Sequence, residues 1–427
     1  MPGDDDLRQV LLDQREELKA PPPAGKWVPR SRERELRDAL RRPLIKVITG
    51  VRRSGKSVLA RLALAGRDFA YVNFDDERLA GLRTEDLQRV EKAVAALRPS
   101  TRLWLLDEVQ NVEGWELFVN RLHRLGWNLV VTGSNSKLLS RELATHLTGR
   151  YVPIEVFPFS FREFLAARDA PVPSAAPTTR ERAGIEERLR EYALVGGFPE
   201  MVVSGPSGGY LRELHDKIVS RDIAARYRVK HPRTLKELSL YCFSNPGAPM
   251  TYNRVQRAFD FRSVHTAESY VGFLEEAYLI LPARPFAFKF REQIRQARKV
   301  YTIDNAMTLA LSTKATQDRG ALLENLVFQE LRRRDLDVFT WTQPDHAVDF
   351  LIREDRRVAQ LVQVCAAFDS PETVAREYRA LHKAAKIARC KDLLLLTPDG
   401  AAPPARFVPR GPKVRVEPLW RWLLGLR

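Results

Sequence analysis

The stretch that decides the fold is residues 50–57, which read Gly50-Val51-Arg52-Arg53-Ser54-Gly55-Lys56-Ser57. This octapeptide is a complete G-x-x-x-x-G-K-[ST] phosphate-binding loop, whose backbone N–H groups surround a phosphate. Gly50 and Gly55 allow backbone angles that a Cβ atom would forbid, so consecutive N–H groups can point inward. Lys56 can reach the β- and γ-phosphates, and the Ser57 hydroxyl can bind Mg²⁺. The loop predicts a site for ATP and Mg²⁺.

The sequence on either side of the loop has the pattern that this motif requires. Residues 44–49 form a β-branched run typical of a strand, and residues 57–64 have the spacing of a helix. The N-terminus of such a helix favours anions. The residues expected to bind the nucleotide are Gly50, Arg53, Ser54, Gly55, Lys56, Ser57 and Val58.

A second apolar run ends in two adjacent carboxylates and predicts hydrolysis. Residues 103–106 are Leu-Trp-Leu-Leu, and Asp107 and Glu108 follow them. We expect Asp107 to hold Mg²⁺ together with Ser57, and Glu108 to orient and deprotonate the attacking water, with Lys56 as the catalytic cation. A chance pair of solvated acids at a strand end is the alternative.

A third apolar run leads into small polar residues. Residues 127–131 precede Thr132-Gly133-Ser134-Asn135, and these residues should end another strand. Ser134 or Asn135 could contact the γ-phosphate or help to hold the water. The chain is therefore predicted to be a Mg²⁺-dependent ATPase.

The charge of the chain predicts a polyanionic partner. Seventy lysines and arginines stand against 54 acidic residues, which gives a formal net charge of +16. A field of this sign attracts nucleic acid first. Basic residues gather in residues 221–236 and 289–299, and the predicted DNA contacts are Arg226, Arg228, Lys230, Arg295 and Arg298. An arginine-rich composition without a partner is the alternative.

Three phenylalanines alternate beside the second basic cluster. Phe286, Phe288 and Phe290 have the period of a strand, so we expect them to form its buried face rather than a base-stacking platform.

The cysteines and the apolar runs predict a cytoplasmic protein. Cys242, Cys365 and Cys390 are widely spaced and have no metal or disulfide pattern. The acidic N-terminus is no signal peptide, and no apolar run approaches the ~20 residues that span a bilayer. We expect no contact with a membrane.

The chain is expected to contain several segments of different character. Repeated βα patterns between residues 43 and 165 predict an α/β domain with a parallel sheet covered on both faces. The other expected segments are a helical leader (1–42), an Ala/Pro-rich linker (166–184), a helical lid (185–232), a winged-helix-like region (233–290), an α/β domain (298–400) and a basic Pro-rich tail (401–427). A plain three-helix spacer is the alternative to the winged helix, whose second helix would enter the major groove.

Together these residues resemble the bacterial and archaeal AAA+ ATPases that carry a C-terminal domain of unknown function. The matching segments are residues 50–57, 106–110, 132–136, 147–150, 196–200, 221–223, 301–304, 323–327 and 348–350. The resemblance implies an AAA+ core, a winged-helix middle and a C-terminal domain similar to restriction-endonuclease folds. DNA binding or remodelling, branched DNA included, is the usual expectation for such proteins.

The resemblance also implies assembly into pairs or rings, such as a hexamer. In such assemblies the arginine of one subunit reaches the γ-phosphate bound by its neighbour. Arg150 and Arg141 are the candidates, and Arg52 and Arg53 are the alternatives.

The C-terminal region departs from the nuclease pattern that this resemblance suggests. Asp349 fits the expected aspartate, and Glu324 could supply a helix carboxylate. The next strand, however, reads Gln363-Val364-Cys365 where a nuclease of this type has Glu-x-Lys to hold Mg²⁺ and polarise water. Asp304-Asn305-Ala306 likewise departs from the expected Asp-x-Gly. We therefore expect a domain that binds or supports but does not cut.

Three functions are compatible with the sequence. The leading hypothesis is an ATP-hydrolysing remodeller or translocase on DNA. The second is a nucleotide-controlled switch in regulation or defence that presents its C-terminal domain to a protein partner. The third is an ATP-dependent nuclease.

Overall fold

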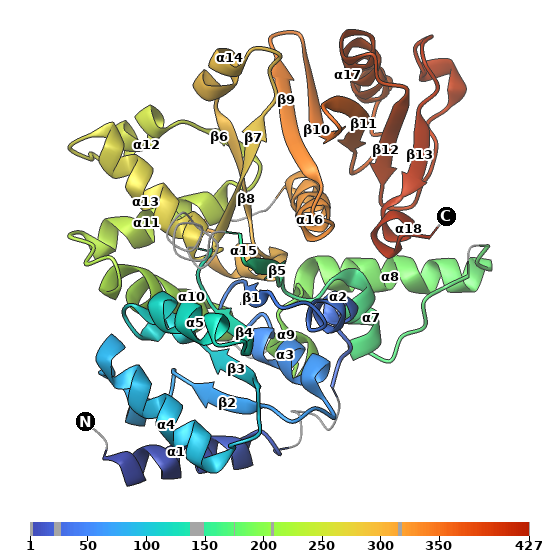
Figure 1. Ribbon diagram of the computed structural model, residues 1–427. Helices are drawn as coiled ribbons and strands as arrows, with labels where there is room; N and C mark the ends of the chain where they lie inside the picture. Colours follow the sequence, from blue (N-terminus) through green and yellow to red (C-terminus); the bar gives the residue numbers. More distant parts are fainter. Residues whose placement is uncertain are drawn as a thin grey trace. The chain divides into compact units, whose positions relative to one another are not determined.

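The strand that leads into the phosphate-binding loop, β1 (Ile45–Thr49), lies inside a five-stranded parallel sheet (Figure 1). The other strands are β2 (Ala70–Asn73), β3 (Leu103–Asp107), β4 (Asn128–Gly133) and β5 (Tyr151–Glu155), and the order is β2-β3-β4-β1-β5. Every residue of β1 and β3 is buried, as a strand covered on both faces requires. The predicted parallel α/β domain is confirmed.

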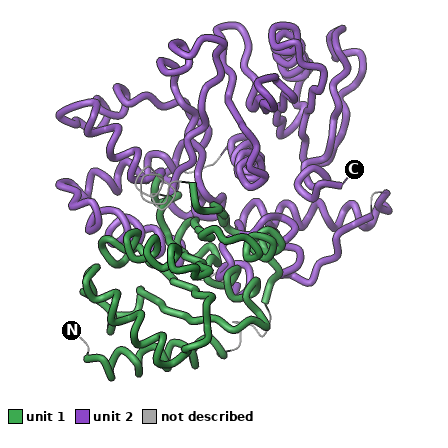
Figure 2. The backbone as a smooth tube through the Cα atoms, viewed as in Figure 1, with its two compact units in different colours: residues 1–158, 276–278 green, residues 159–275, 279–427 purple. Residues whose placement is uncertain are grey.

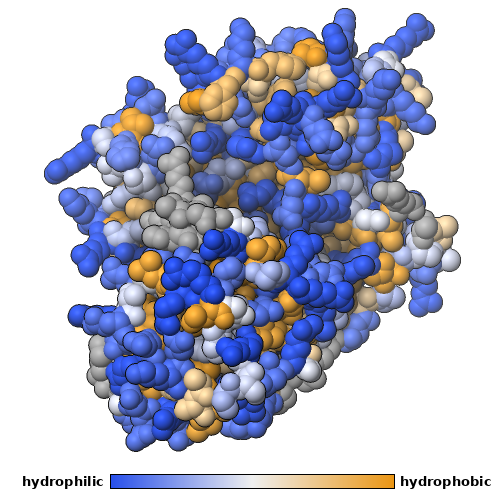
Figure 3. All heavy atoms as spheres, in the orientation of Figure 1, coloured by the Kyte–Doolittle hydropathy of each residue, from blue (hydrophilic) through white to orange (hydrophobic). Residues whose placement is uncertain are grey.

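The structure is a computed structural model that describes residues 3–20, 27–136, 149–174, 176–205, 209–314 and 318–426. It divides into two compact units, coloured in Figure 2. The first unit is Met1–Pro158 with Glu276–Tyr278, and the second is Phe159–Glu275 with Leu279–Arg427. No helix in the described ranges is long and apolar enough to cross a membrane, and the face drawn in Figure 3 is mostly hydrophilic.

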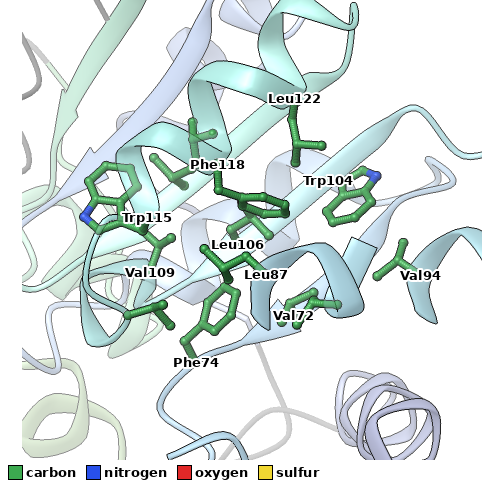
Figure 4. Packing of buried hydrophobic residues seen from close by; sticks show 14 of the residues in the cluster. Val72, Phe74, Leu87, Val94, Trp104, Leu106, Val109, Trp115, Phe118 and Leu122 are labelled. Carbon is green, nitrogen blue, oxygen red and sulfur yellow. The ribbon is translucent and has the colours of Figure 1, made fainter. Parts of the chain in front are cut away.

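Helices cover both faces of the sheet in the first unit. These elements are α1 (Asp4–Glu17), α2 (Glu33–Ala39), α3 (Lys56–Leu64), η2 (Glu77–Leu79), η3 (Thr84–Asp86), α4 (Leu87–Leu97), η4 (Val109–Asn111) and α5 (Trp115–Arg124). Figure 4 shows one core, in which Trp104, Phe118 and Leu122 pack between the sheet and α5. Leu7 of α1 is buried in this same cluster, so the predicted leader helix is part of the unit. Residues 137–148, which follow β4, lie outside the described residues.

The second unit begins with helices. They are α7 (Phe161–Ala167), α8 (Thr179–Val195), α9 (Pro199–Val203), α10 (Tyr210–Lys217), the π-helix η6 (Ile218–Ala225), α11 (Pro232–Ser244), α12 (Tyr252–Ala258) and α13 (Val264–Glu276). The hydroxyl of Thr251 accepts the N–H of Arg254, and that of Ser263 accepts the N–H of Thr266. Both residues therefore cap their helices.

An eight-stranded sheet completes the second unit. Its strands are β6 (Ala248–Met250), β7 (Ile280–Pro285), β8 (Arg298–Thr302), β9 (Asp337–Gln343), β10 (His346–Glu354), β11 (Arg357–Val364), β12 (Asp392–Thr397) and β13 (Arg415–Pro418), in the order β13-β12-β11-β10-β9-β7-β8-β6. The remaining elements are α14 (Phe290–Arg295), α15 (Asn305–Leu311), α16 (Arg319–Arg333), α17 (Pro371–Ala388), η7 (Ala405–Phe407) and α18 (Leu419–Leu424). Two residue pairs, Arg284 with Phe339 and Pro285 with Thr340, join β7 to β9.

The structure changes what the sequence predicted for strand β8, for residues 286–290 and for the C-terminal tail. Strand β8 pairs antiparallel with β6 and β7, so it belongs with the hairpin that precedes it rather than opening the last domain. The expected strand face at Phe286–Phe290 is wrong, because β7 ends at Pro285: Phe286 is buried, but Phe288 is 67% exposed and Phe290 is 75% exposed. The tail adds β13 and α18 to the unit, and its Trp420 and Trp422 are buried.

Two of the matching motifs meet in the second unit. The Asp304 carboxylate accepts the N–H of Gly197 at 2.7 Å and that of Met307 at 3.1 Å, so it caps α15. Gly196 has φ +72°, and a Cβ atom on it would collide with this carboxylate. The segments 196–200 and 301–304 therefore contact each other and stabilise the fold of the second unit.

Candidate nucleotide site

The phosphate-binding loop connects β1 to α3. At two of its positions the backbone adopts angles that favour glycine. Gly50 has φ +150° and Gly55 has φ +90°. A Cβ atom on Gly50 would collide with the carbonyl oxygen of Val156, because the loop runs against the chain that follows β5. The Ser54 N–H donates to the carbonyl of Val51 at 3.2 Å and closes the turn. These contacts fix the loop without using a side chain that a nucleotide needs.

Lys56 and Ser54 supply polar groups inside the loop. The buried Nζ of Lys56 lies 3.3 Å from the carbonyl oxygen of Val51 and 3.4 Å from Oε1 of Glu108. The Ser54 Oγ is buried and has no hydrogen-bond partner among the described residues. A buried donor without a partner costs free energy, and a phosphate oxygen would satisfy it. The loop therefore fits a nucleotide phosphate.

Asp107 and Ser57 lie together, as the spacing of their motifs predicts. The Ser57 hydroxyl donates to Oδ1 of Asp107 at 3.0 Å. The Thr132 hydroxyl donates to the same oxygen, and the Tyr71 hydroxyl donates to Oδ2 at 3.2 Å. Burial and the neighbouring Glu108 charge raise the pKa of Asp107, although the hydroxyls oppose this. A carboxylate and a hydroxyl at this spacing are ligands that suit Mg²⁺.

Glu108 is held as an ionised carboxylate beside the loop. Its φ of +49° is unusual for a non-glycine residue, and its N–H donates to the Thr132 hydroxyl at 3.1 Å. Its Oε2 accepts the Gln110 amide at 2.5 Å. Burial alone would raise the pKa of Glu108, but Lys56, Gln110 and Arg52 outweigh burial and lower this pKa below its usual value. A general base needs this ionised state at neutral pH.

Ser134 and Asn135 are buried where β4 ends, beside the end of β3. Oγ of Ser134 lies 3.4 Å from the Gln110 amide nitrogen, so a chain of polar groups connects Ser134 to Glu108. The structure therefore places Ser134 near the expected base. Asn135 follows it in the chain, and its role as a phosphate contact stays a prediction.

The candidate arginines occupy different places. Arg52 pairs with Asp75 at 3.1 Å, and the exposed Arg53 has φ +66°. Arg150 is exposed and directly precedes β5, whose first residue pairs with Ile45 at the start of β1. Arg150 therefore lies at the amino-terminal ends of the strands, whereas the loop of its own subunit lies at their carboxyl ends. Arg141 lies outside the described residues, and Val58 is half-buried on α3.

Sequence reasoning missed three positioning residues of the first unit. Gln110 carries a local signal, since it follows Glu108 by two residues on the short helix η4. Tyr71 comes from the neighbouring strand β2, and no motif marks it. Tyr278 donates a hydrogen bond to Thr49, the residue before Gly50, across 229 positions of sequence. Only the fold reveals such a contact.

The carboxylates of the nuclease-like region meet around a lysine. Nζ of Lys299 lies 2.9 Å from Oε1 of Glu324 and 3.5 Å from Oδ1 of Asp349. Gln363 accepts the Asp349 N–H at 3.2 Å and donates to Glu377 at 2.7 Å. Glu324, Asp349 and Gln363 line a cavity of about 1580 Å³. In the described part of the chain, no group of three or more His, Cys, Asp or Glu side chains is arranged to hold a metal ion.

The residues predicted to contact DNA all lie in the second unit. Arg228 and Lys230 are exposed and Arg226 is half-exposed, in the segment between η6 and α11. Arg295 ends α14, and the guanidinium of Arg298 lies 5.8 Å from the centre of the Tyr252 ring. The structure leaves these side chains accessible, and their contact with DNA stays a prediction.

Comparison with known proteins places this site in a family. Residues 42–165 match the family described as AAA domain, and residues 186–318 match a domain of unknown function. An uncharacterized protein of Methanocaldococcus jannaschii is 31% identical over 397 residues, which are 89% of this chain and 88% of that protein. An uncharacterized protein of Haemophilus influenzae is 32% identical over 357 residues, 79% of this chain and 86% of that protein.

Among solved structures, a Walker-type ATPase of Pyrococcus abyssi is similar to 67% of this chain, and the match covers 96% of that ATPase. The identity is 16% and the TM-score is 0.43, a likeness too distant to bear on function.

Proposed function

The chain belongs to the family of AAA-domain proteins that includes these archaeal and bacterial relatives, and on this premise we propose that it hydrolyses ATP and couples hydrolysis to DNA. One observation carries the ATPase part of the proposal. Lys56 and Ser57 of the loop lie within 3.4 Å and 3.0 Å of Glu108 and Asp107 at the end of β3. The protein groups that would bind the phosphates, the cation and the water thus lie together at the carboxyl ends of the strands of a parallel sheet.

Each side chain has a separate task in this proposal. The loop N–H groups and Lys56 hold the phosphates, and Ser57 and Asp107 hold Mg²⁺, which offsets the phosphate charge when it is bound. Glu108 orients the water and accepts its proton. In the structure Lys56 already pairs with Glu108, so a γ-phosphate would share the lysine and leave the carboxylate beside the water.

Self-association belongs to the same proposal. Arg150 is exposed at the sheet edge opposite the loop of its own subunit, which supports a role at the nucleotide site of a neighbour. Mixing the two inactive variants Arg150→Ala and Lys56→Ala should restore part of the activity, because a mixed interface can contain one intact loop and one intact arginine. Sedimentation with a non-hydrolysable ATP analogue should show oligomers. A strict monomer that turns over ATP would exclude the role of Arg150.

The DNA part of the proposal rests on charge. The formal charge of +16 and the accessible Arg226, Arg228, Arg295 and Arg298 suit a phosphate backbone. If they contact DNA, log K should fall with log salt by about 0.9 per neutralised phosphate. Neutral substitution of all four should flatten this slope and leave basal ATP hydrolysis intact. Equal slopes for parent and variant would contradict these contacts.

Steady-state ATP hydrolysis with duplex, single-stranded and branched DNA tests the whole proposal. Stimulation by one of these DNAs supports coupling, and indifference to all three favours the switch with a protein partner. Cut DNA would favour the nuclease. The arrangement around Lys299 opposes cutting, because its ammonium lies between the two carboxylates that a divalent cation would need.

A further inference from the structure

An exposed aromatic and basic tip projects from the second unit between β7 and β8. We call residues 288–298 the α14 tip. Its apolar side chains are strongly exposed: Phe288 by 67%, Phe290 by 75% and Ile294 by 68%. Helix α14 has no buried residue, so Phe290 and Ile294 do not contribute to the core. Exposed apolar side chains gathered in one place are typical of a binding surface.

The ring of Phe288 is held in place although it is exposed. It packs edge to face against Phe286, with ring centres 5.2 Å apart and planes at 76°. It packs in the same way against Trp341, at 6.1 Å and 80°. Both neighbours are buried, so they fix the ring while two thirds of the residue remains accessible. An oriented aromatic ring loses little conformational entropy when it stacks on a ligand.

Positive charge surrounds these rings. The α14 tip contains Lys289, Arg291, Arg295 and Arg298 against the single acid Glu292, a net charge of +3 (four minus one). Oε1 of Glu292 lies 3.5 Å from Nζ of Lys289, and among the described residues neither Arg291 nor Arg295 forms an ion pair with an acid. Figure 3 shows apolar atoms at the surface where Figure 1 places α14, with hydrophilic atoms beside them. The ligand must therefore be anionic and must offer flat apolar faces.

We propose that the α14 tip binds unpaired bases of single-stranded or forked DNA, with Phe288 and Phe290 stacking on bases and the arginines contacting phosphates. Base stacking on aromatic side chains inside a basic surface is the general way in which proteins hold single strands. The inference rests on the proposed coupling to DNA and names the form of DNA that this surface recognises.

Two other occupants fit less well. A helix of six residues is about 9 Å long, much shorter than the helices that lie in a membrane interface. A protein partner would favour an apolar centre free of charge, but here basic residues alternate with the rings. The alternation of ring and cation instead matches the alternation of base and phosphate along a nucleic-acid strand.

The test compares parent protein with a Phe288→Ala/Phe290→Ala variant by fluorescence anisotropy. The probes are a labelled single strand, a forked duplex and a blunt duplex of the same sequence. Loss of one stacked ring should lower affinity at least about fivefold, so the double variant should lose about 25-fold or more on the single strand and the fork. Its affinity for the blunt duplex should change by less than about threefold, because the arginines remain.

Matched variants distinguish the loss of base stacking from the loss of any exposed apolar side chain and from unfolding. Leu194→Ala removes a residue of α8 that is 61% exposed and should change no affinity. Ile294→Ala removes an apolar side chain that cannot stack and should cost less than either ring. If Phe288→Ala unfolds because it contacts Trp341, Phe290→Ala alone should still weaken single-strand binding. Phe290→Trp should keep it. Melting temperature checks the fold of each variant.

Three outcomes would overturn the inference. One is unchanged single-strand affinity in the double variant, and another is an equal loss on blunt duplex. The third is binding to phosphatidylglycerol vesicles that depends on the rings while DNA affinity does not. Basal ATP hydrolysis, measured in parallel, should stay at the parent rate. If the protein hydrolyses ATP but its DNA affinity does not depend on the two rings, only the proposal for the α14 tip is refuted. If its single-strand affinity depends on the rings but it hydrolyses no ATP, only the proposed ATPase activity is refuted.

Discussion

Tyr278 donates a 2.8 Å hydrogen bond to the hydroxyl of Thr49, the last residue before the phosphate-binding loop. Both side chains are buried, and Tyr278 has φ +61°, a backbone region that bulky residues seldom adopt. Tyr278 lies in the connection between α13 and β7, and Glu276–Tyr278 belongs to the first unit, whereas the chain before and after it belongs to the second. The base of the loop is therefore held by a residue from that distant connection.

Replacing Tyr278 with Phe should loosen this attachment. The change removes one hydroxyl and leaves Thr49 without this donor, so we expect the free energy of unfolding to fall by about 1 kcal/mol. Nucleotide affinity should fall several-fold, because the loop loses part of its support. A fluorescent ATP analogue measures the affinity, and urea unfolding measures the stability.

Tyr192→Phe is the matched control for this prediction. Its buried hydroxyl donates to the carbonyl of Phe159 at 2.7 Å, within the second unit. The control should lose a similar free energy of unfolding without any loss of nucleotide affinity. If both variants bind nucleotide like the parent, the Tyr278 contact only stabilises the fold.

Lys56→Ala and Glu108→Gln should separate binding from turnover. Lys56→Ala removes the cation of the loop and should abolish nucleotide binding. Glu108→Gln keeps the shape and the contact with Gln110 but cannot accept a proton, so binding should persist while the rate falls on the order of 100-fold or more. Phosphate release and analogue binding measure the two quantities. Hydrolysis by Glu108→Gln at the parent rate would show that another group is the base.

The motifs that are short and continuous in the chain could be predicted from the sequence, and so could their proximity at the nucleotide site. The loop, Asp107 and Glu108 belong to strands whose carboxyl ends meet in any parallel sheet, so their proximity follows from the βα pattern. Lys299 and Tyr278 were missed, because each comes from an element whose pairing is not encoded locally: β8 pairs with β7, and Tyr278 joins the other unit. Phe288 was misread because the strand period was extended past Pro285, where the ladder ends.

Lys46 is a buried cation on β1 whose charge should reduce stability at neutral pH. Its Nζ donates to the carbonyl of Arg42 at 3.0 Å and to the Asn128 amide oxygen at 2.5 Å, and no carboxylate pairs with it among the described residues. Burial lowers the pKa of Lys46 from 10.5 to about 8. The unfolded chain therefore binds this proton more tightly, and the stability from Lys46 is present above pH 10.5 and lost as pH falls through about 8.

Lys46→Met should accordingly stabilise the protein at pH 7. The removed charge would contribute about 3 kcal/mol, and the unpaired Asn128 oxygen would cost about 1 kcal/mol, so we expect a net gain of about 1–2 kcal/mol. The gain should vanish towards pH 10.5, the unfolded pKa. Chemical unfolding of both proteins at several pH values measures it. A variant less stable than the parent at every pH would contradict the charge argument.

Asp349 should give the second unit the opposite kind of pH dependence. Burial and the nearby Glu324 charge raise the pKa of Asp349 to about 7, although Lys299 opposes this. The folded state therefore holds the Asp349 proton more tightly than the unfolded chain, whose value is 3.8. The resulting stability is full below about pH 4 and is lost as pH rises through about 7.

Replacing Asp349 with Asn should remove this dependence. Asn has the same shape and can still accept the Val364 N–H, which donates to Asp349 at 3.0 Å. The difference in free energy of unfolding between variant and parent should grow in favour of Asn by up to about 1.4 kcal/mol per pH unit between pH 4 and 7. Lys299→Met should instead destabilise the protein by about 3 kcal/mol at neutral pH, because two carboxylates whose side chains are only 17% and 13% exposed lose their cation. Parallel pH curves for Asp349→Asn and the parent would show that Asp349 titrates normally. Lys299 would then form ordinary ion pairs with Glu324 and Asp349, and the argument that its ammonium takes the place of a divalent cation would lose its electrostatic basis.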